Sequence, residues 1–347
     1  MTLRILLPIL LALTLGSCVG SSGRHGAATL ATGDIVTTDT VFTFDSEYPV
    51  EIQHSEGNIY VTLHESDSLV CVISTASKTI TDRFGKAGQG PDDFSSLEFF
   101  ANAATLPGKP QFLDCNSGKT FSPDSDGIYR TNRLPVSWIS PLNKFGDRYV
   151  GKKVGKPDVF FSIFDNTGNE LQSVPYPFSL AESTKSKISG KEYLLSPYVF
   201  ANGDKGRIIA AMYYADAAFV YDSIGNLLTS ISLNTDKNSN INGMICDVVD
   251  NRPYTRYRGG CAMETSCFMR LSHYIPDLEL QEMRPEQSCL LEFDWDGTLL
   301  NIYNMEEDIV AFCIDRDRTM WTLKRATDND NEYYHILRQT LNKASAL

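Results

Sequence analysis

One turn motif recurs along this chain and limits the folds that it can adopt. The motif is an aromatic residue, Asp, two variable residues and Gly, with a short apolar run on each side. It occurs in FFSIFDNTGNEL (160–171), FVYDSIGNLL (219–228) and LLEFDWDGTLL (290–300), and in a degraded form at 121–129, where Pro123 replaces the aromatic residue. Asp accepts hydrogen bonds within a turn, and Gly adopts positive φ at no steric cost. Each copy therefore predicts two antiparallel strands joined by a tight turn.

The spacing of apolar runs predicts an all-β chain. Runs of four to seven residues alternate with turn clusters, and helical periodicity is nearly absent. Six strand units have lengths typical of propeller blades, at about 48–84, 97–132, 136–174, 194–231, 241–303 and 309–337. A spare strand at 35–44 would close the ring and remove two exposed sheet edges if it paired with the last unit. We therefore expect a six-bladed β-propeller over residues 34–342, with its ring closed by the N-terminal strand.

Residues 1–17 have the pattern of a signal peptide. Arg4 supplies the positive charge, and the apolar run Ile5–Leu15 follows it. That run is much shorter than the roughly 20 apolar residues that a membrane-spanning helix needs. Gly16 and Ser17 are the small residues that a signal peptidase requires before its cut. The leader therefore predicts export of the chain.

The end of this leader, Leu15-Gly16-Ser17-Cys18, resembles the lipobox of bacterial lipoproteins. The resemblance implies cleavage before Cys18, a diacylglyceryl group on its sulfur and an acyl chain on its amino group. Two or more chains are needed for stable membrane anchoring. The alternative is an ordinary signal peptide followed by an incidental cysteine. Residues 18–33 are rich in Gly, Ser, Ala and Thr, which predicts a flexible tether between the lipid and the propeller.

The net charge of the chain argues against one class of partner. The chain has 31 basic and 43 acidic residues, a net charge of -12, which argues against nucleic acid as a partner.

The cysteines of the chain cannot all form disulfides with one another. Seven of its eight cysteines follow Cys18, and an odd number cannot pair completely. Cys71 and Cys313 lie in apolar runs and should be buried, whereas the spacing of Cys261 and Cys267 allows a short disulfide. No paired Cys-x-x-Cys is present and the histidines are scattered, so we expect no cofactor.

The glycine-rich segment GKAGQGPDDF (85–94) is predicted to be a structural loop between two units. A phosphate-binding loop would need a following Lys-Ser/Thr and a helix, and neither is present. The segment resembles the Gly-x-x-Gly-x-Gly-Pro-acidic-Phe signature of the TolB-like six-bladed β-propeller lipoproteins of Bacteroidetes. The later segments 291–297 and 309–315 resemble the corresponding part of the same family. This resemblance covers essentially all of the chain after the leader and departs from the signature at Asp92, where Gly is usual. It implies a propeller fold and a location in the cell envelope, and it supplies no functional residues.

The stretch Asn251–Cys267 has the most unusual local composition and is interpreted as an insertion in the fifth unit. It interleaves cations with aromatic rings at Arg252, Tyr254, Arg256, Tyr257 and Arg258. Tyrosine faces stack on ring compounds, and Arg binds carboxylate or phosphate. These five residues are therefore candidate ligand-binding residues. The alternative is a solvated loop whose arginines pair with nearby acidic side chains.

No catalytic or metal-binding residue can be identified from the sequence. The acidic segment at 328–332 lacks the glycine and the distal glutamate of a calcium loop, and it is expected to be a hairpin turn. His54, His64, His273 and His335 show no ligand spacing. A propeller enzyme would require side chains that converge from several blades, and one sequence does not reveal such convergence.

These observations favour a noncatalytic propeller that binds a protein or carbohydrate ligand. Lipid at Cys18 would hold it on the outer membrane, facing the periplasm. Two alternatives remain, a metal-dependent hydrolase or lyase of the propeller lactonase type and a structural partner in an envelope assembly.

Overall fold

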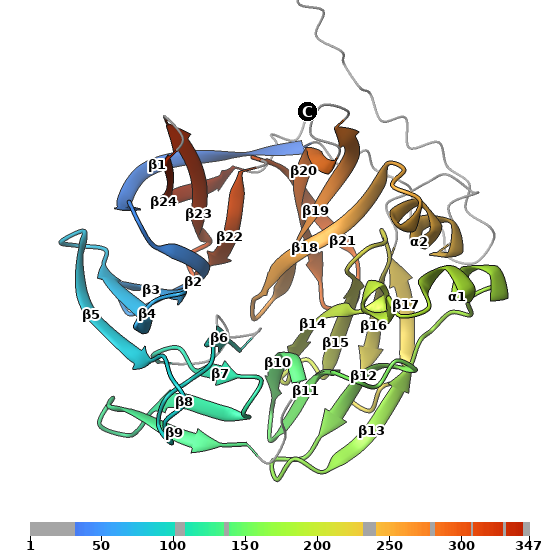
Figure 1. The fold of residues 1–347 in the computed structure, drawn as a ribbon, viewed down its shortest axis with the longest axis horizontal. Coiled ribbons are helices and arrows are strands. Elements are labelled where there is room, and N and C mark those ends of the chain that lie inside the picture. Colours follow the sequence, from blue (N-terminus) through green and yellow to red (C-terminus); the bar gives the residue numbers. More distant parts are fainter. Residues whose placement is uncertain are drawn as a thin grey trace, which may run out of the picture.

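The computed structural model of this chain describes residues 32–100, 108–134, 139–231, 241–277, 282–306, 308–328 and 331–342. The predicted signal peptide and most of the predicted tether, including Cys18, lie outside these residues. The described chain is mostly β-strand, and its sheets are arranged around a common centre as in a propeller (Figure 1). The expected all-β, propeller-like architecture is confirmed.

Each of the first four predicted units forms a separate four-stranded antiparallel sheet, with its strands in sequence order. The sheets are β2 (Tyr48–Ser55), β3 (Asn58–His64), β4 (Ser68–Ser74) and β5 (Thr79–Lys86); β6 (Glu98–Phe99), β7 (Phe112–Asp114), β8 (Lys119–Pro123) and β9 (Tyr129–Arg133); β10 (Ile139–Phe145), β11 (Arg148–Lys153), β12 (Val159–Phe164) and β13 (Glu170–Pro175); and β14 (Pro197–Asn202), β15 (Arg207–Met212), β16 (Ala218–Asp222) and β17 (Leu227–Ile231).

The last two predicted units share one eight-stranded sheet. Its order is β18-β19-β20-β21-β1-β24-β23-β22. The strands are β1 (Thr32–Phe44), β18 (Tyr254–Ala262), β19 (Ser266–Asp277), β20 (Glu282–Asp294), β21 (Leu299–Met305), β22 (Ile309–Ile314), β23 (Thr319–Asp328) and β24 (Asn331–Asn342). Strand β1 runs antiparallel to β24, which confirms the expected pairing of the N-terminal strand with the last unit. The described strands form five separate sheets rather than the expected six, because the first two residues of β1 also pair with β21.

Thr32 and Gly33, which the sequence assigned to the tether, belong to β1. They pair in parallel with Ile302 and Tyr303. A side chain at Gly33 would collide with the carbonyl oxygen of Asn342 and approach the Tyr303 ring. Glycine here allows close approach between strands, although in the sequence it suggested flexibility.

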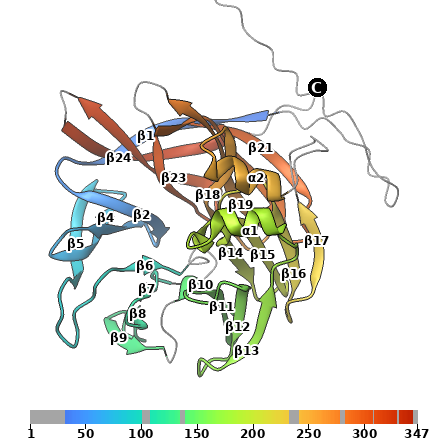
Figure 2. The ribbon, with the colours of Figure 1, turned by 45° about the vertical axis from the view of Figure 1, so that its right-hand side comes forward.

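Two short helices, α1 (Glu182–Ile188) and α2 (Ile241–Val249), lie side by side at one face of the ring (Figures 1 and 2). The Lys187 ammonium forms an ion pair with Asp250 at 2.8 Å, just beyond α2. Ile188 and Ile245 are buried in the core shared by the third and fourth sheets. Segments this short carry little helical periodicity, so the sequence did not reveal them. None of the described helices is long and apolar enough to cross a membrane.

The hydrophobic core is divided among the spaces between consecutive units. The described apolar side chains gather in six clusters, and each cluster joins strands from two neighbouring units. Strands in the middle of a sheet, such as β4 and β12, are buried along nearly their whole length. The last strands of their sheets, such as β5 and β17, are mostly exposed. Strands buried on both faces appear in the sequence as continuous apolar runs, which is why they were easy to locate.

The recurring Asp turn has the geometry that its sequence predicts. In each of the three full copies, the Asp carboxylate accepts hydrogen bonds from the backbone N–H groups two and four residues later, at 2.7–3.1 Å. The Gly three residues after the Asp has a φ between 84° and 89°. The degraded copy at Asp124 keeps both hydrogen bonds, and Gly127 has a φ of 75°. The same turn at Asp315 carries Arg318 in the glycine position, with a φ of 63°.

Arg318 is tolerated in this turn because its side chain reaches a buried carboxylate. Its guanidinium donates to Glu292 at 2.7 and 2.8 Å and to the Tyr303 hydroxyl at 3.3 Å. The Glu292 side chain is only 2% exposed. Removing one partner of a buried ion pair lowers the stability of the folded protein by about 3–5 kcal/mol, because the other charge is left buried and unpaired. The left-handed backbone at Arg318 is therefore offset by an ion pair between neighbouring units.

The suggested Cys261–Cys267 disulfide is not formed. Cys261 pairs in register with Phe268, and Cys267 pairs with Ala262. The two thiols lie in different core clusters, on opposite faces of the β18–β19 hairpin. Cys71 and Cys313 are buried, as expected.

Turn glycines that contact the preceding unit should be more sensitive to substitution than glycines in open turns. A Cβ at Gly225 would lie 2.6 Å from Val174 Cγ2, whereas Gly146, also at positive φ, has nothing within 4 Å. We expect Gly225→Ala to cost about 1–3 kcal/mol more than Gly146→Ala, because overpacking adds to the left-handed backbone cost. Urea unfolding monitored by circular dichroism measures both costs. Equal losses would show that contact between the units does not constrain the turn.

Candidate functional site

The segment that was interpreted as an insertion is largely a regular strand. Residues Tyr254–Ala262 form β18, the first strand of their sheet. The interpretation as an inter-strand loop was wrong because alternating polar and aromatic residues here belong to a strand that is only partly covered. The fifth unit is long because it begins with α2 and because β19 and β20 have 12 and 13 residues.

Two of the five candidate ligand-binding residues have structural partners. Arg252 is exposed and forms ion pairs with Asp247 at 2.9 Å and Asp250 at 3.1 Å. This is the arrangement that the alternative interpretation predicted. Tyr257 is fully buried in the core, and its hydroxyl donates to Asp216 Oδ1 at 3.3 Å. The structure therefore does not bring these two residues to a shared surface with the others.

Tyr254 and Arg256 belong to one group of aromatic side chains. The Tyr254 ring stacks on Tyr274 with centroids 5.2 Å apart, and the Arg256 guanidinium lies 4.5 Å from the Tyr274 centroid. Arg256 also donates to the Tyr274 hydroxyl at 3.0 Å and lies over the rings of Tyr213 and Tyr214. These contacts connect β18 and β19 to the end of β15, so Arg256 joins two neighbouring sheets.

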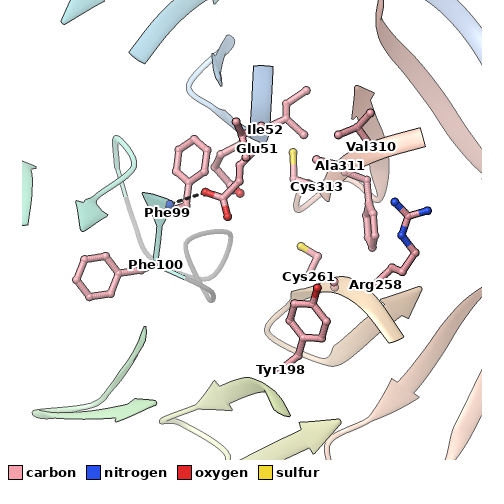
Figure 3. Close-up of a pocket in the computed structure, with 15 residues that line it drawn as sticks. Glu51, Ile52, Phe99, Phe100, Tyr198, Arg258, Cys261, Val310, Ala311 and Cys313 are labelled. Atoms are coloured by element: carbon pink, nitrogen blue, oxygen red, sulfur yellow. Dashed lines mark hydrogen bonds between the residues drawn. The ribbon is translucent and has the colours of Figure 1, made fainter. Parts of the chain in front are cut away.

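Arg258, the fifth candidate, lines a pocket at the centre of the ring (Figure 3). We call this the central pocket; its volume is about 280 Å³. Five sequence-distant segments contribute to it, namely β2, β14, β18, β22 and the segment Phe99–Phe100. Because first strands of different units meet here, the pocket is a product of the ring arrangement.

The walls of the central pocket are mainly apolar. They include Ile52, Phe99, Phe100, Val310, Ala311, Phe312 and the two thiols of Cys261 and Cys313. The polar lining groups are Glu51, Gln53, Tyr198 and Arg258. Glu51 and Arg258 lie on opposite sides of the pocket (Figure 3). A mainly apolar cavity with a few polar groups is the usual composition of a small-molecule site.

Among the residues that line this pocket, Glu51 carries a carboxyl group, and its pKa is strongly shifted. Burial, together with the nearby Glu98 carboxylate, raises the pKa of Glu51 to about 8, and a hydrogen bond from the Phe99 N–H at 2.8 Å offsets part of the effect. Burial also raises the pKa of Glu98, whose carboxylate accepts a hydrogen bond from Ser140 Oγ at 2.9 Å. At neutral pH, Glu51 is therefore mostly protonated and can donate a hydrogen bond.

Sequence reasoning missed most of the pocket. Glu51, Tyr198 and Phe99 come from three different sheets, and none belongs to a local motif. Their convergence depends on how the sheets pack, which one sequence does not show. The available signal was weak, since a charged residue beside Ile52 at the start of an inner strand is common in any sheet.

The histidines have separate local partners. His54 Nδ1 lies 3.3 Å from Asp315 Oδ2, and its ring stacks on Trp321. His273 and His335 each contact a threonine hydroxyl, at 3.2 and 2.9 Å. Within the part of the chain that the structure describes, no three His, Cys, Asp or Glu side chains are grouped so that they could hold a metal ion.

The glycine-rich segment is a structural loop, as predicted. Ala87 and Phe94 form a bridge across it, and the Asp93 carboxylate accepts a hydrogen bond from the Gly90 N–H at 2.9 Å. A Cβ at Gly90 would lie 2.7 Å from that carboxylate. Its glycines therefore make room for Asp93, and the loop connects the first sheet to the second.

Comparisons with known proteins identify the fold and no family. No protein-family model and no curated protein matches this chain. A member of the DUF4221 family from Bacteroides vulgatus matches with a TM-score of 0.51 at 10% identity, over 91% of this chain and 98% of that chain. A protein from Bacteroides fragilis, described by inference as exported, matches with a TM-score of 0.51 at 13% identity, over 89% and 97%.

A streptogramin B lyase structure also matches, with a TM-score of 0.45 at 11% identity over 86% of this chain and 98% of that chain. At these identities the likenesses show similarity of fold alone, and activity has to be argued from the residues of this chain.

Glu51 should make the stability of the protein depend on pH. Its pKa is about 8 in the folded state and near 4.5 in the unfolded chain. Between these values the unfolded state loses a proton that the folded state keeps, so rising pH favours unfolding. We expect Glu51→Gln to raise the melting temperature more at pH 8 than at pH 5.

The matched control is Glu65→Gln, which removes a carboxyl group that is 72% exposed. Thermal denaturation of the wild type and both variants at the two pH values gives the comparison. If the gain from Glu51→Gln did not grow with pH, or did not exceed that of the control, Glu51 would be ionised in the folded protein.

Proposed function

We propose that this protein is a lipid-anchored, six-bladed propeller of the TolB-like type that binds a small ligand in its central pocket without catalysing a reaction. The central pocket is the single observation that carries the ligand-binding part of this proposal. Its volume of about 280 Å³ is close to the lower end of the range for ligand sites, and first strands of several sheets hold its walls rigidly.

The division of the core supports the proposed number of six blades. Among the described residues, six apolar clusters lie between six consecutive groups of strands. The eight-stranded sheet would then count as two blades, joined only where Thr32 and Gly33 of β1 meet β21. Strand β1 completes the last blade by pairing with β24 and would close the ring.

The membrane location rests on the leader sequence. Leu15-Gly16-Ser17-Cys18 has the lipobox pattern, and the following residues have the composition of a tether. We propose that the propeller is held through Cys18 on the periplasmic face of an outer membrane. There the acidic surface of the chain would face water.

Lipid attachment gives a direct test. In a bacterial host, radiolabelled palmitate should enter the wild-type protein and be lost in Cys18→Ala. Cys115→Ala is the matched control, because it removes another thiol that is only partly buried. Labelling that persisted in Cys18→Ala, or that never entered the wild type, would exclude the anchor.

Ligand binding can be tested with a neutral probe, 3-phenylpropan-1-ol. We expect saturable binding at one site in calorimetry, because the apolar walls accept a ring of this size. In methyl NMR spectra, the probe should shift the signals of Ile52 and Val310, which line the pocket, and leave that of the exposed Ile128 unchanged.

Pocket-filling variants provide the control. Ala311→Trp and Val310→Trp place bulk in the pocket, whereas Leu228→Trp adds the same side chain to the exposed outer strand β17. Only the first two should lose binding. If the pocket methyl signals did not respond, or if filled variants bound normally, the central pocket would not be the ligand site.

A further inference from the structure

Arg258 is an arginine without a carboxylate partner in an acidic protein. It lines the central pocket and is partly buried, and among the described residues its guanidinium forms neither an ion pair nor a hydrogen bond. A partly buried charge loses hydration, and proteins usually compensate this loss with a counter-charge.

Other arginines of this chain show what such compensation looks like. Arg83 donates to both oxygens of Glu47 at 2.6 and 2.8 Å. Arg318 holds Glu292 in the same two-point manner. With 43 acidic residues against 31 basic ones, a carboxylate partner is readily available. The guanidinium N–H groups of Arg258 are therefore available to donate to both oxygens of a ligand carboxylate.

The rest of the pocket selects the uncharged part of the ligand. Val310, Ala311 and Phe312 of β22 present apolar surface. An apolar cavity of about 150 Å³ holds a benzene-sized molecule. A volume of about 280 Å³ therefore suits one ring with a short chain, or an aliphatic chain of similar bulk.

We propose that the central pocket binds a small carboxylic acid, with the ligand carboxylate on the Arg258 guanidinium and its ring or aliphatic chain against the apolar side chains of β22. This inference rests on the proposed function and names its ligand class. The shared chemistry is one carboxylate attached to an apolar body of one-ring size. The body is either aromatic or aliphatic.

Glu51 does not oppose such a ligand at neutral pH. Its pKa is raised to about 8, so its carboxyl group is mostly uncharged. The titratable and charged groups that face it are Glu98 on β6, Tyr198 on β14, Arg258 and Cys261 on β18 and Cys313 on β22. Above pH 8 an ionised Glu51 would repel the ligand carboxylate across the pocket. Affinity for the acid should therefore fall as pH rises.

The test compares three molecules of one shape by calorimetry at pH 6.5, namely 3-phenylpropionate, 3-phenylpropan-1-ol and 3-phenylpropylamine. We expect the acid to bind about 10- to 100-fold more tightly than the alcohol, the gain typical of a charge-assisted hydrogen bond. The amine should bind most weakly. Hexanoate distinguishes an aliphatic from an aromatic ligand body. If the natural ligand is aliphatic, hexanoate should bind more tightly than 3-phenylpropionate.

Variants assign the preference to Arg258. Arg258→Gln should remove the acid-over-alcohol preference while the alcohol still binds, and Arg258→Lys should restore part of it. Arg252→Gln is the matched control, because Arg252 is exposed and pairs with Asp247 and Asp250. In wild-type protein the affinity for the acid should fall several-fold from pH 6.5 to 9, and Glu51→Gln should abolish this dependence.

The two proposals fail in different ways. If the alcohol binds in the pocket and the acid binds no more tightly, the carboxylate inference is wrong and the proposed function stands. The inference is equally wrong if Arg258→Gln keeps the preference. If none of the four molecules binds, the proposed function fails and the inference fails with it.

Discussion

Face-to-face packing between consecutive strand units is the interaction on which this structure depends. The described core consists of clusters that each need two units, so no unit buries its apolar faces alone. Such an arrangement is stable only if the first and last units also meet. Strand β1 provides that contact by pairing with β24, and it brings Val41 and Phe44 into the cluster between the first and last units.

The same constraint acts on the turns. A Cβ atom at Gly225 or Gly297 would collide with Val174 or Val220 of the preceding unit, so a tight turn and close packing require the same residue. The turn at Asp315 satisfies the constraint differently, because Arg318 reaches across to the buried Glu292. The aromatic contacts of Arg256 join two further sheets, so residues that looked like ligand contacts in the sequence partly hold the ring together.

Packing of the ring also creates the central pocket and sets its charge. First strands converge there, and burial beside Glu98 leaves the Glu51 carboxyl mostly neutral at pH 7. With Glu51 neutral, the positive charge of Arg258 is the main charge of this largely apolar cavity. In a chain with an excess of acidic residues, this is an unusual local balance, and it is the physical basis for expecting an acidic ligand.

The sequence by itself determined the strand units, the buried runs such as the one around Cys71, the Asp turns and the pairing partner of the first strand. These features follow from local turn chemistry and from the period of the apolar pattern. Only the tertiary structure decided that Cys261 and Cys267 face opposite ways, that Tyr257 is fully buried while Arg258 lines a pocket, and that Glu51 lies across this pocket from Arg258. Strand register and the angles between sheets fix these relations, and both arise from contacts between residues far apart in the chain.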